Sequence, residues 1–390
     1  MKRALCAALL LALALAGCGV RAAQPLTAEE RPADGAGARP RENERAADTV
    51  GRMLAGMSRE EKVWQMLVLF PQQIVGEAST ADAALWQEGM AAHPAGGVIF
   101  DGENIISETA LKEMLAAAGA AGKIAPLLCV DEEGGAVARV SYALGVTTKF
   151  KPMFTYREGG TETAYANAQT IGSEIAAFGF NVDFAPVADV WTNPENTVIG
   201  RRAYSDEPEE AAALVSAAVR GFHAGGVACV LKHFPGHGDT AEDSHDTAAY
   251  CSKTLEELEA CELIPFAAGM AAGADMVMVG HITLPALDPE HPATLSRDVV
   301  TGLLRERMGY DGVVITDALR MGALSGERAD AAEAAVLAVE AGCDLLLAPE
   351  DPEAVVQALL TSVDEARLDE SVRRILTLKL ARGLIAAEGE

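Results

Sequence analysis

The sequence is short of basic side chains. Its 390 residues include 31 Lys and Arg against 57 Asp and Glu, which gives a formal net charge of −26. This excess of negative charge disfavours electrostatic binding to the phosphates of nucleic acid or to an anionic membrane surface. Half of the residues are apolar, which is typical of a globular protein with a large core. We therefore expect no nucleic-acid partner.

Cysteine is scarce as well. Beyond residue 18 the chain has Cys129, Cys229, Cys251, Cys261 and Cys343. Their number is odd, and three of them lie in apolar, strand-like runs, so a framework of disulfide bonds is not expected. We interpret these residues as buried thiols.

The apolar run at the N-terminus is too short for a typical membrane span. Two basic residues precede the apolar stretch Ala4–Ala16, which has the length of a secretory signal. The stretch leads into Leu15-Ala16-Gly17-Cys18, which resembles the bacterial lipobox, whose cysteine becomes the lipidated first residue of the mature protein. An ordinary cleaved signal is the alternative. We predict a signal peptide over residues 1–17 and a lipid anchor at Cys18, which would attach the protein to the membrane outside the cytoplasm.

Apolar periodicity is absent between Gly19 and about Ala47. This segment is rich in Ala, Arg, Glu, Pro and Gly, a composition that favours a flexible chain over a packed one. We predict a tether over residues 18–47, followed by one folded domain over residues 48–390.

The fold class follows from eight short apolar runs that alternate with longer amphipathic segments, the pattern of β/α units around a parallel sheet. The runs are Gln65–Phe70, Gly97–Phe100, Pro126–Asp131, Val182–Val190, Val227–Phe234, Asp275–His281, Gly312–Asp317 and Asp344–Ala348. Eight units predict a (β/α)8 barrel. A doubly wound open sheet is the alternative, but the glycine fingerprint expected after its first strand is missing at Phe70-Pro71-Gln72-Gln73.

Polar residues end several of these runs. Because catalytic residues of a (β/α)8 barrel lie at the carboxyl ends of its strands, we expect these side chains to converge on one pocket. An Asp after a strand can instead cap the next helix, and for Asp189 the two interpretations stay open. The set is Asp131, Asp189, Lys232, His233, His281 and Asp317.

The stretch Val227–Asp246 carries three of the seven histidines, at His233, His237 and His245. Together with nearby carboxylates they could bind a divalent metal, or they could be satisfied by backbone groups within turns. A phosphate-binding loop is disfavoured because no Gly-Lys-Ser/Thr follows the glycines. Acid/base chemistry is the remaining interpretation, in which Asp243 orients and charges the imidazole of His245.

The same stretch reads K-H-F-P-G-H-G-D-T from Lys232, followed by Asp243-Ser244-His245, and it resembles the signature of glycoside hydrolase family 3 in its NagZ-like β-N-acetylglucosaminidase branch. Further motifs follow the family's order from about Val50 to Ile385. They are Met57–Val68, Val130–Val140, Phe184–Val190, Asn193–Ser205 and Gly312–Leu324. The chain departs from the family at Ala136, where an arginine is common, and at Ala318, where many relatives have a second aspartate.

The resemblance implies a role for individual residues. Asp317 matches the catalytic nucleophile. His245 matches the acid/base and Asp243 its partner, a pair that replaces the Glu-bearing second domain of larger members. The positions that match sugar-binding residues are Asp131, Arg139, Arg202, Lys232 and His233.

The function implied by this resemblance is a retaining exo-β-N-acetylglucosaminidase. It would act as a monomer, without a metal or an organic cofactor, on terminal β-linked N-acetylglucosamine in carbohydrate such as peptidoglycan fragments. Close alternatives are a different sugar preference, or transfer of the sugar to phosphate. Alternatives from other classes are a sugar-binding lipoprotein without turnover and a metal-dependent hydrolase.

Overall fold

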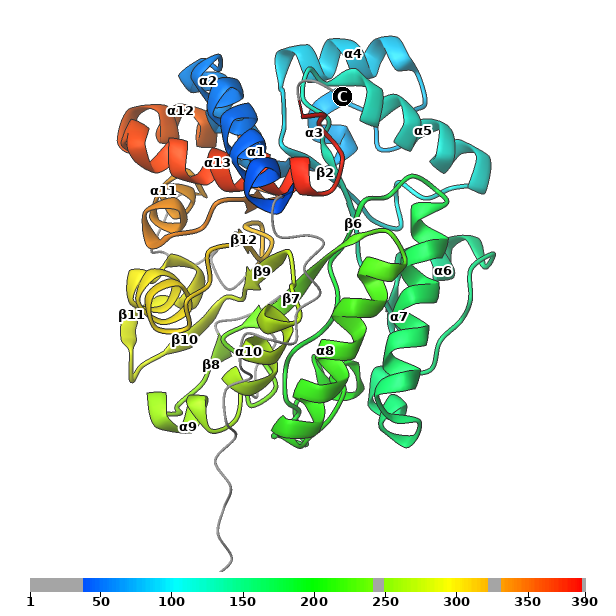
Figure 1. The fold of residues 1–390 in the computed structure, drawn as a ribbon, viewed down its shortest axis with the longest axis vertical. Helices are drawn as coiled ribbons and strands as arrows, with labels where there is room; N and C mark the ends of the chain where they lie inside the picture. The colour runs from blue at the N-terminus through cyan, green and yellow to red at the C-terminus, as the bar shows by residue number, and fades with distance from the viewer. Residues whose placement is uncertain (1–37, 241–248, 322–330, 388–390) are drawn as a thin grey trace, which may run out of the picture. The chain divides into compact units, whose positions relative to one another are not determined.

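The computed structural model describes residues 38–240, 249–321 and 331–387, shown in Figure 1. Eight parallel strands form one sheet in the order β12-β9-β7-β6-β3-β2-β1-β13. A parallel bridge between Ile315 and Leu345 joins β12 to the residue before β13, so the two outer strands of this order meet. The sheet is therefore a nearly closed barrel, and the predicted (β/α)8 fold is confirmed. The strands are β1 (Leu67–Leu69), β2 (Gly97–Phe100), β3 (Leu127–Val130), β6 (Val182–Asp183), β7 (Ala228–Phe234), β9 (Met276–Val279), β12 (Val313–Thr316) and β13 (Leu346–Leu347).

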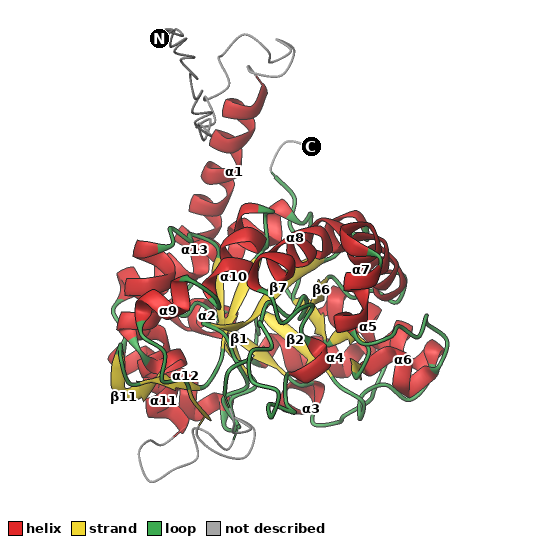
Figure 2. Cartoon of the chain, turned by 90° about the horizontal axis from the view of Figure 1, so that it is seen from below, coloured by secondary structure: helices red, strands yellow, loops and turns green. Residues whose placement is uncertain are grey.

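Helices surround this sheet, as Figure 2 shows. Several begin with a side-chain cap predicted by elementary helix chemistry: Ser58 and Glu61 form a capping box at α2, and Thr254 and Glu257 form another at α9. The helices are α1 (Ala38–Ala55), α2 (Arg59–Gln65), α3 (Pro71–Val75), α4 (Ala83–Ala92), α5 (Glu108–Ala121), α6 (Arg139–Leu144), α7 (Gly160–Ala176), α8 (Pro208–Ala224), α9 (Leu255–Glu259), α10 (Leu263–Ala271), the π-helix η4 (Asp298–Arg307), α11 (Ala331–Ala341), α12 (Pro352–Ser362) and α13 (Glu365–Ala381).

Each of the eight predicted runs contains one barrel strand, but the strand of Val182–Val190 is much shorter than its run. Only Val182 and Asp183 belong to β6, and a single bridge between Val187 and Lys232 follows. Pro186 lies between them and has no N–H to donate to the ladder, which explains the interruption.

The barrel strands are buried on both sides, as helix-covered parallel strands must be. Every residue of β1, β2, β3, β7, β9 and β12 is buried. The chain forms two compact units, Met1–Glu44 and Arg45–Glu390, and the barrel lies in the second. Among the described residues no helix is both long enough and apolar enough to span a bilayer.

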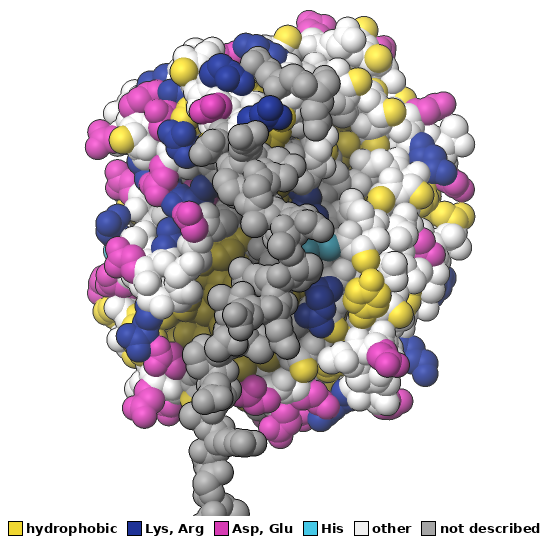
Figure 3. Space-filling view, in the orientation of Figure 1, with side chains coloured by type: hydrophobic (Ala, Val, Ile, Leu, Met, Phe, Trp, Pro, Cys, Tyr) yellow, Lys and Arg dark blue, Asp and Glu magenta, His cyan; other side chains and the backbone are white. Residues whose placement is uncertain are grey.

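The five predicted thiols are all free. Four of them are buried as expected, whereas Cys261 is partly exposed because it lies in the short connection between α9 and α10. Acidic and basic side chains are interspersed over the face seen in Figure 3, so the negative net charge is not concentrated there.

Candidate active site

A cavity of about 380 Å³ lies at the carboxyl ends of the barrel strands. Its wall includes residues within or directly after all eight strands, at the end of the barrel that carries catalytic groups in enzymes of this fold. Residues singled out by the sequence line the cavity: Asp131, Arg139, Arg202, Lys232, His233 and Asp317. Segments far apart in the chain thus place these side chains around one space.

Two carboxylates and two cations form a connected network in the cavity wall. The Lys232 ammonium lies 2.6 Å from Asp131 Oδ1 and 2.7 Å from Glu133 Oε1. The Arg202 guanidinium binds Glu133 in a forked arrangement, with Nε 2.9 Å from Oε2 and Nη2 2.7 Å from Oε1. Asp131, Arg202 and Lys232 were predicted from the sequence as site residues. Glu133 was not, although it lies inside the Val130–Val140 motif.

Three members of the network, Glu133, Lys232 and Arg202, are charged at neutral pH. Burial alone raises the pKa of the Glu133 carboxyl, but the charges of Arg202 and Lys232 outweigh burial and hold this pKa well below its usual value. Burial lowers the pKa of the Lys232 ammonium, yet Asp131 and Glu133 keep that pKa above its usual value. Glu133 therefore cannot serve as a proton donor near pH 7.

His233 is held by Asp189 at the carboxyl end of β7. Its Nδ1 lies 2.8 Å from Asp189 Oδ2, and the backbone N–H groups of His233 and His237 both donate to Asp189 Oδ1. Because a carboxylate only accepts, Nδ1 carries the proton of this contact. The expectation that Asp189 lines the pocket is wrong, because this residue is fully buried behind His233. It orients a cavity residue, and it caps no helix in the described part of the chain.

Asp317 follows the last residue of β12 and lines the cavity. Its backbone N–H donates to the carbonyl oxygen of Val279, and its Oδ1 accepts the N–H of Ala318 at 2.8 Å. The carboxylate is thereby held at the strand end, on the wall of the cavity.

The expectation that His281 lines the pocket is wrong. This residue is buried, and its Nε2 donates to the carbonyl oxygen of Ala318 at 3.0 Å. Its Nδ1 lies 2.8 Å from Thr294 Oγ1, so both ring nitrogens contact neighbouring groups of the protein and not the cavity.

Arg139 is the first residue of α6, and its side chain is exposed to the cavity. The buried Glu132 carboxylate accepts the N–H groups of Val140 and Ser141, at 2.7 and 3.0 Å, and so caps this helix. Burial raises the pKa of Glu132 to about 7. No local pattern in the sequence indicated this role, because Glu132 precedes the first residue of α6 by seven positions.

Arg320 and Asp101 also line the cavity and were not predicted. The Arg320 guanidinium stacks 4.3 Å from the centre of the Phe70 ring, and it lies 4.0 Å from Asp101. Half of the Arg320 side chain is exposed, so the mouth of the cavity presents a cation held against an aromatic ring.

The predicted acid/base residues Asp243 and His245 lie outside the described residues. Side-chain contacts hold the described segment that precedes them. His237 Nδ1 lies 2.7 Å from Thr240 Oγ1, and the Asn196 amide donates to the His237 carbonyl oxygen. Gly238 lies so close to the segment after β6 that a Cβ would come within 1.9 Å of the Val190 oxygen. Only glycine fits there.

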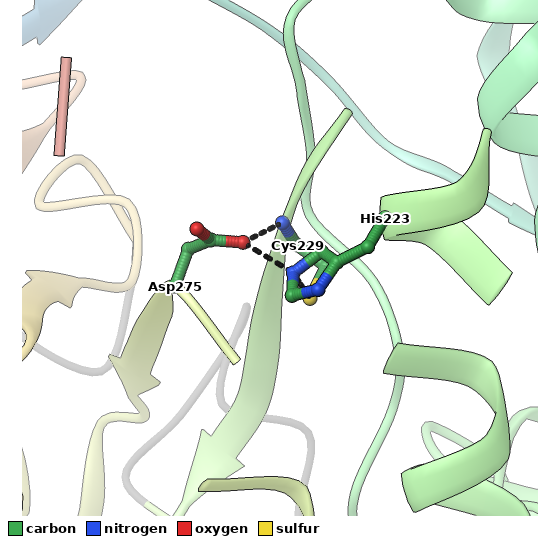
Figure 4. A group of neighbouring side chains, drawn as sticks. All are labelled: His223, Cys229 and Asp275. Carbon is green, nitrogen blue, oxygen red and sulfur yellow. Dashed lines mark hydrogen bonds and ion pairs between the residues drawn. The ribbon is translucent and has the colours of Figure 1, made fainter. Parts of the chain in front are cut away.

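Within the described part of the chain, one group of His, Cys and carboxylate ligands is close enough to share an ion: His223, Cys229 and Asp275, drawn in Figure 4. It lies at the start of β7 and β9, at the end of the barrel opposite to the cavity. His223 Nε2 is 2.8 Å from Asp275 Oδ2 and 2.6 Å from Arg382 Nη2, and Arg382 also binds Asp275. A guanidinium already neutralises this cluster, which disfavours a metal cation there.

Comparisons with known proteins agree with this geometry. A model of the glycosyl hydrolase family 3 N-terminal domain matches residues 58–378. A beta-hexosaminidase of Xanthomonas axonopodis pv. citri (strain 306) is 38% identical over 290 residues, which are 73% of this chain and 85% of that protein.

Solved structures are similar as well. The structure of a glycoside hydrolase family 3 beta-N-acetylglucosaminidase from Paenibacillus sp. str. FPU-7 matches with a TM-score of 0.78 and 38% identity, over 86% of this chain and 66% of that chain. The beta-N-acetylhexosaminidase from Beutenbergia cavernae DSM 12333 matches with a TM-score of 0.72 and 30% identity, over 84% of this chain and 99% of that chain.

Proposed function

Because the chain belongs to glycosyl hydrolase family 3, we propose that it is a retaining exo-β-N-acetylglucosaminidase with Asp317 as its nucleophile. The observation that carries this proposal is the position of Asp317, which directly follows β12 and shares one cavity with a network of cations and carboxylates suited to sugar hydroxyls. The substrate class follows the hexosaminidase and N-acetylglucosaminidase relatives of similar sequence.

The first chemical step uses Asp317. Its carboxylate attacks the anomeric carbon, the bond from that carbon to the leaving oxygen breaks, and a glycosyl ester forms on the enzyme. Water then attacks the same carbon and releases Asp317, so the sugar leaves with its original configuration. The sugar-binding side chains Asp131, Arg139, Arg202, Lys232 and His233 hold the ring during both steps.

A proton donor for the leaving oxygen is needed, and we assign this role to His245 with Asp243 as its partner. The buried carboxylate of Glu133 has a depressed pKa, and Asp131 is tied to Lys232, so neither is suited to donate a proton. An imidazole ionises close to neutral pH and can donate in the first step and accept in the second. Chemistry of this kind requires no metal or organic cofactor.

The natural substrate is proposed to be terminal β-linked N-acetylglucosamine in peptidoglycan fragments. With a lipid anchor at Cys18, the monomeric enzyme would meet such fragments outside the cytoplasm, at the membrane. This location rests on the N-terminal sequence alone. The tether predicted over residues 18–47 would then be shorter than expected, because α1 begins at Ala38.

The test is a screen of nitrophenyl β-glycosides, with and without phosphate. We expect nitrophenol release from the N-acetylglucosaminide with free N-acetylglucosamine as product, and little release from the glucoside. Formation of a sugar phosphate would assign phosphate as the acceptor. Sugar binding without turnover of any glycoside would support a binding protein, and loss of activity with a chelator would support a metal-dependent hydrolase.

A further inference from the structure

Glu133 contacts both cations of the cavity wall. Its carboxylate is almost completely buried, with 1% of the side chain exposed, and it accepts from Arg202 and from Lys232 at the same oxygen, Oε1. A buried carboxylate that binds two cationic groups at once fixes the orientation of both groups.

The Arg202 guanidinium has five N–H groups in one plane. Two are directed to Glu133, through Nε and Nη2, and a third donates from Nη1 to the Val198 carbonyl oxygen at 3.0 Å. Among the described residues these contacts leave one N–H on Nη1 and one on Nη2 for a ligand. Because the fork on Glu133 fixes the plane of the guanidinium, it also fixes where these two donors point.

The Lys232 ammonium has three N–H groups. Two are directed to Asp131 and Glu133, so the contacts within the described chain leave one for a ligand. Only 3% of this side chain is exposed, and the residue lines the cavity. The remaining donor therefore has a set direction as well.

Charge leads to the same conclusion. Asp131 and Glu133 balance Lys232 and Arg202, so the wall offers oriented N–H donors without an uncompensated charge. A neutral sugar that displaces water from such a wall finds donors in place and leaves no buried cation unpaired.

We propose that Glu133 is a positioning residue for the sugar, which fixes the N–H groups that Arg202 and Lys232 present to the sugar hydroxyls. This inference rests on the proposed function for the identity of its ligand. Glu133 itself does not contact the reacting atoms. Its carboxylate acts through the two cations.

The test compares Glu133→Gln with the wild-type enzyme on the nitrophenyl β-N-acetylglucosaminide and on its 3-, 4- and 6-deoxy analogues. Glutamine has the shape of glutamate, but its amide NH2 would face an N–H donor of Arg202 or Lys232, so the forked contact cannot persist. We expect KM for the parent glycoside to rise roughly tenfold or more, with a smaller change in kcat.

The analogues separate positioning from stability. In the wild-type enzyme, loss of the hydroxyl that the two cations hold should raise KM strongly; in Glu133→Gln the same loss should change KM by less than about twofold, because the contact is already lost. A variant that is merely less stable would lose activity by one common factor on all four glycosides. That result, measured on protein shown to be folded by circular dichroism, would overturn the proposal.

Two further variants complete the design. Glu133→Asp keeps the charge and should show an intermediate effect, and it replaces the glutamine variant if that one does not fold. Glu174→Gln makes the same chemical change at a carboxylate that does not line the cavity and that accepts hydrogen bonds from Thr148, and it should leave KM unchanged.

Failure of the proposed function can be distinguished from failure of the proposed role of Glu133. If the wild-type enzyme prefers another sugar, the N-acetylglucosamine assignment fails, while the deoxy series of the preferred sugar still tests Glu133. If it turns over no glycoside, calorimetric binding of the monosaccharides and their deoxy analogues to the wild type and Glu133→Gln gives the same comparison.

Discussion

At the scale of single residues, the proposed nucleophile Asp317 is the first side chain to test. Asp317→Asn keeps the size of the side chain and its contact with the Ala318 N–H, but an amide does not form the glycosyl ester. We expect kcat to fall by roughly three orders of magnitude or more, with N-acetylglucosamine binding largely retained.

The matching measurement uses a fluorosugar that traps the glycosyl-enzyme intermediate. Mass spectrometry of the labelled protein should place the label on the peptide that contains Asp317. A label on another carboxylate, such as Asp131, would remove Asp317 as the nucleophile.

An experiment on His245 as the proposed acid/base must distinguish it from His233, which pairs with the Asp189 carboxylate and lines the cavity. A general acid matters most when the leaving group is poor. His245→Ala should therefore slow hydrolysis of β-linked disaccharides by about 10²-fold or more while leaving the first step on activated aryl glycosides nearly intact. Asp243→Asn should act in the same direction but more mildly.

His233→Ala is the matched control. Because His233 is proposed to bind the sugar, this variant should raise KM on both kinds of substrate, with no dependence on the leaving group. If His233→Ala showed the leaving-group dependence and His245→Ala did not, the acid/base role would belong to the His233–Asp189 pair.

At the scale of elements, α6 depends on a buried carboxylate for its position. Glu132 caps α6, and burial raises the pKa of this carboxyl from 4.5 to about 7. Between these values the folded protein holds a proton that the unfolded chain has lost. The contribution of Glu132 to the free energy of unfolding is therefore present below about pH 4.5 and lost as the pH rises through about 7. The two pKa values differ by about 2.5, which corresponds to a free energy of about 3 kcal/mol.

Glu132→Gln removes this dependence, because the amide oxygen can still accept an N–H of α6 without a buried charge. The free energy of unfolding of the variant, taken relative to that of the wild type, should increase by up to about 3 kcal/mol when the pH is raised from 5 to 8. Urea unfolding of both proteins at the two pH values measures this difference. An equal difference at both pH values would show that Glu132 stays ionised in the folded protein.

At the scale of the whole molecule, Asp344 connects the last strands of the barrel to α13. It is fully buried, receives the N–H of Val314 at 3.0 Å, and lies 2.6 Å from Arg305 and 3.3 Å from Arg374. Asp344→Asn would leave buried guanidinium groups without their carboxylate and should lower the free energy of unfolding by about 3–5 kcal/mol.

Asp311→Asn is the control for this variant. It removes a carboxylate that also pairs with Arg374 but is 94% exposed, so it should lower the free energy of unfolding by less than about 1 kcal/mol. Urea unfolding measures both effects. KM of folded Asp344→Asn should remain normal, because Asp344 lies at the end of the barrel opposite to the cavity; equal stability of the two variants would show that the charge cluster does not hold the barrel closed.

The proposed membrane attachment also concerns the whole molecule. Cys18→Ala should move the protein from the membrane fraction to an unprocessed or soluble form, because the acylated residue is lost. Fractionation of cells that express both proteins measures this shift. Membrane retention of a correctly cleaved variant would contradict lipidation at Cys18.

The sequence by itself determined the barrel and the residues at its strand ends. Apolar runs such as Gly97–Phe100 are buried on both sides in a parallel sheet, so hydrophobic periodicity alone predicted all eight strands. Residues such as Lys232 and Asp317 were found because a parallel barrel places all carboxyl ends of its strands at one edge.

Only the tertiary structure decided what these residues contact. Glu133 and Arg202 are 69 positions apart, and Lys232 approaches them from another strand, so no local pattern could show that one carboxylate serves both cations. The alternatives at Asp189 were likewise open in the sequence, since capping a helix and orienting His233 require the same residue type after a strand. Pairing between distant segments is set by the packing of the barrel, and it is this packing that turns a set of polar strand ends into one cavity.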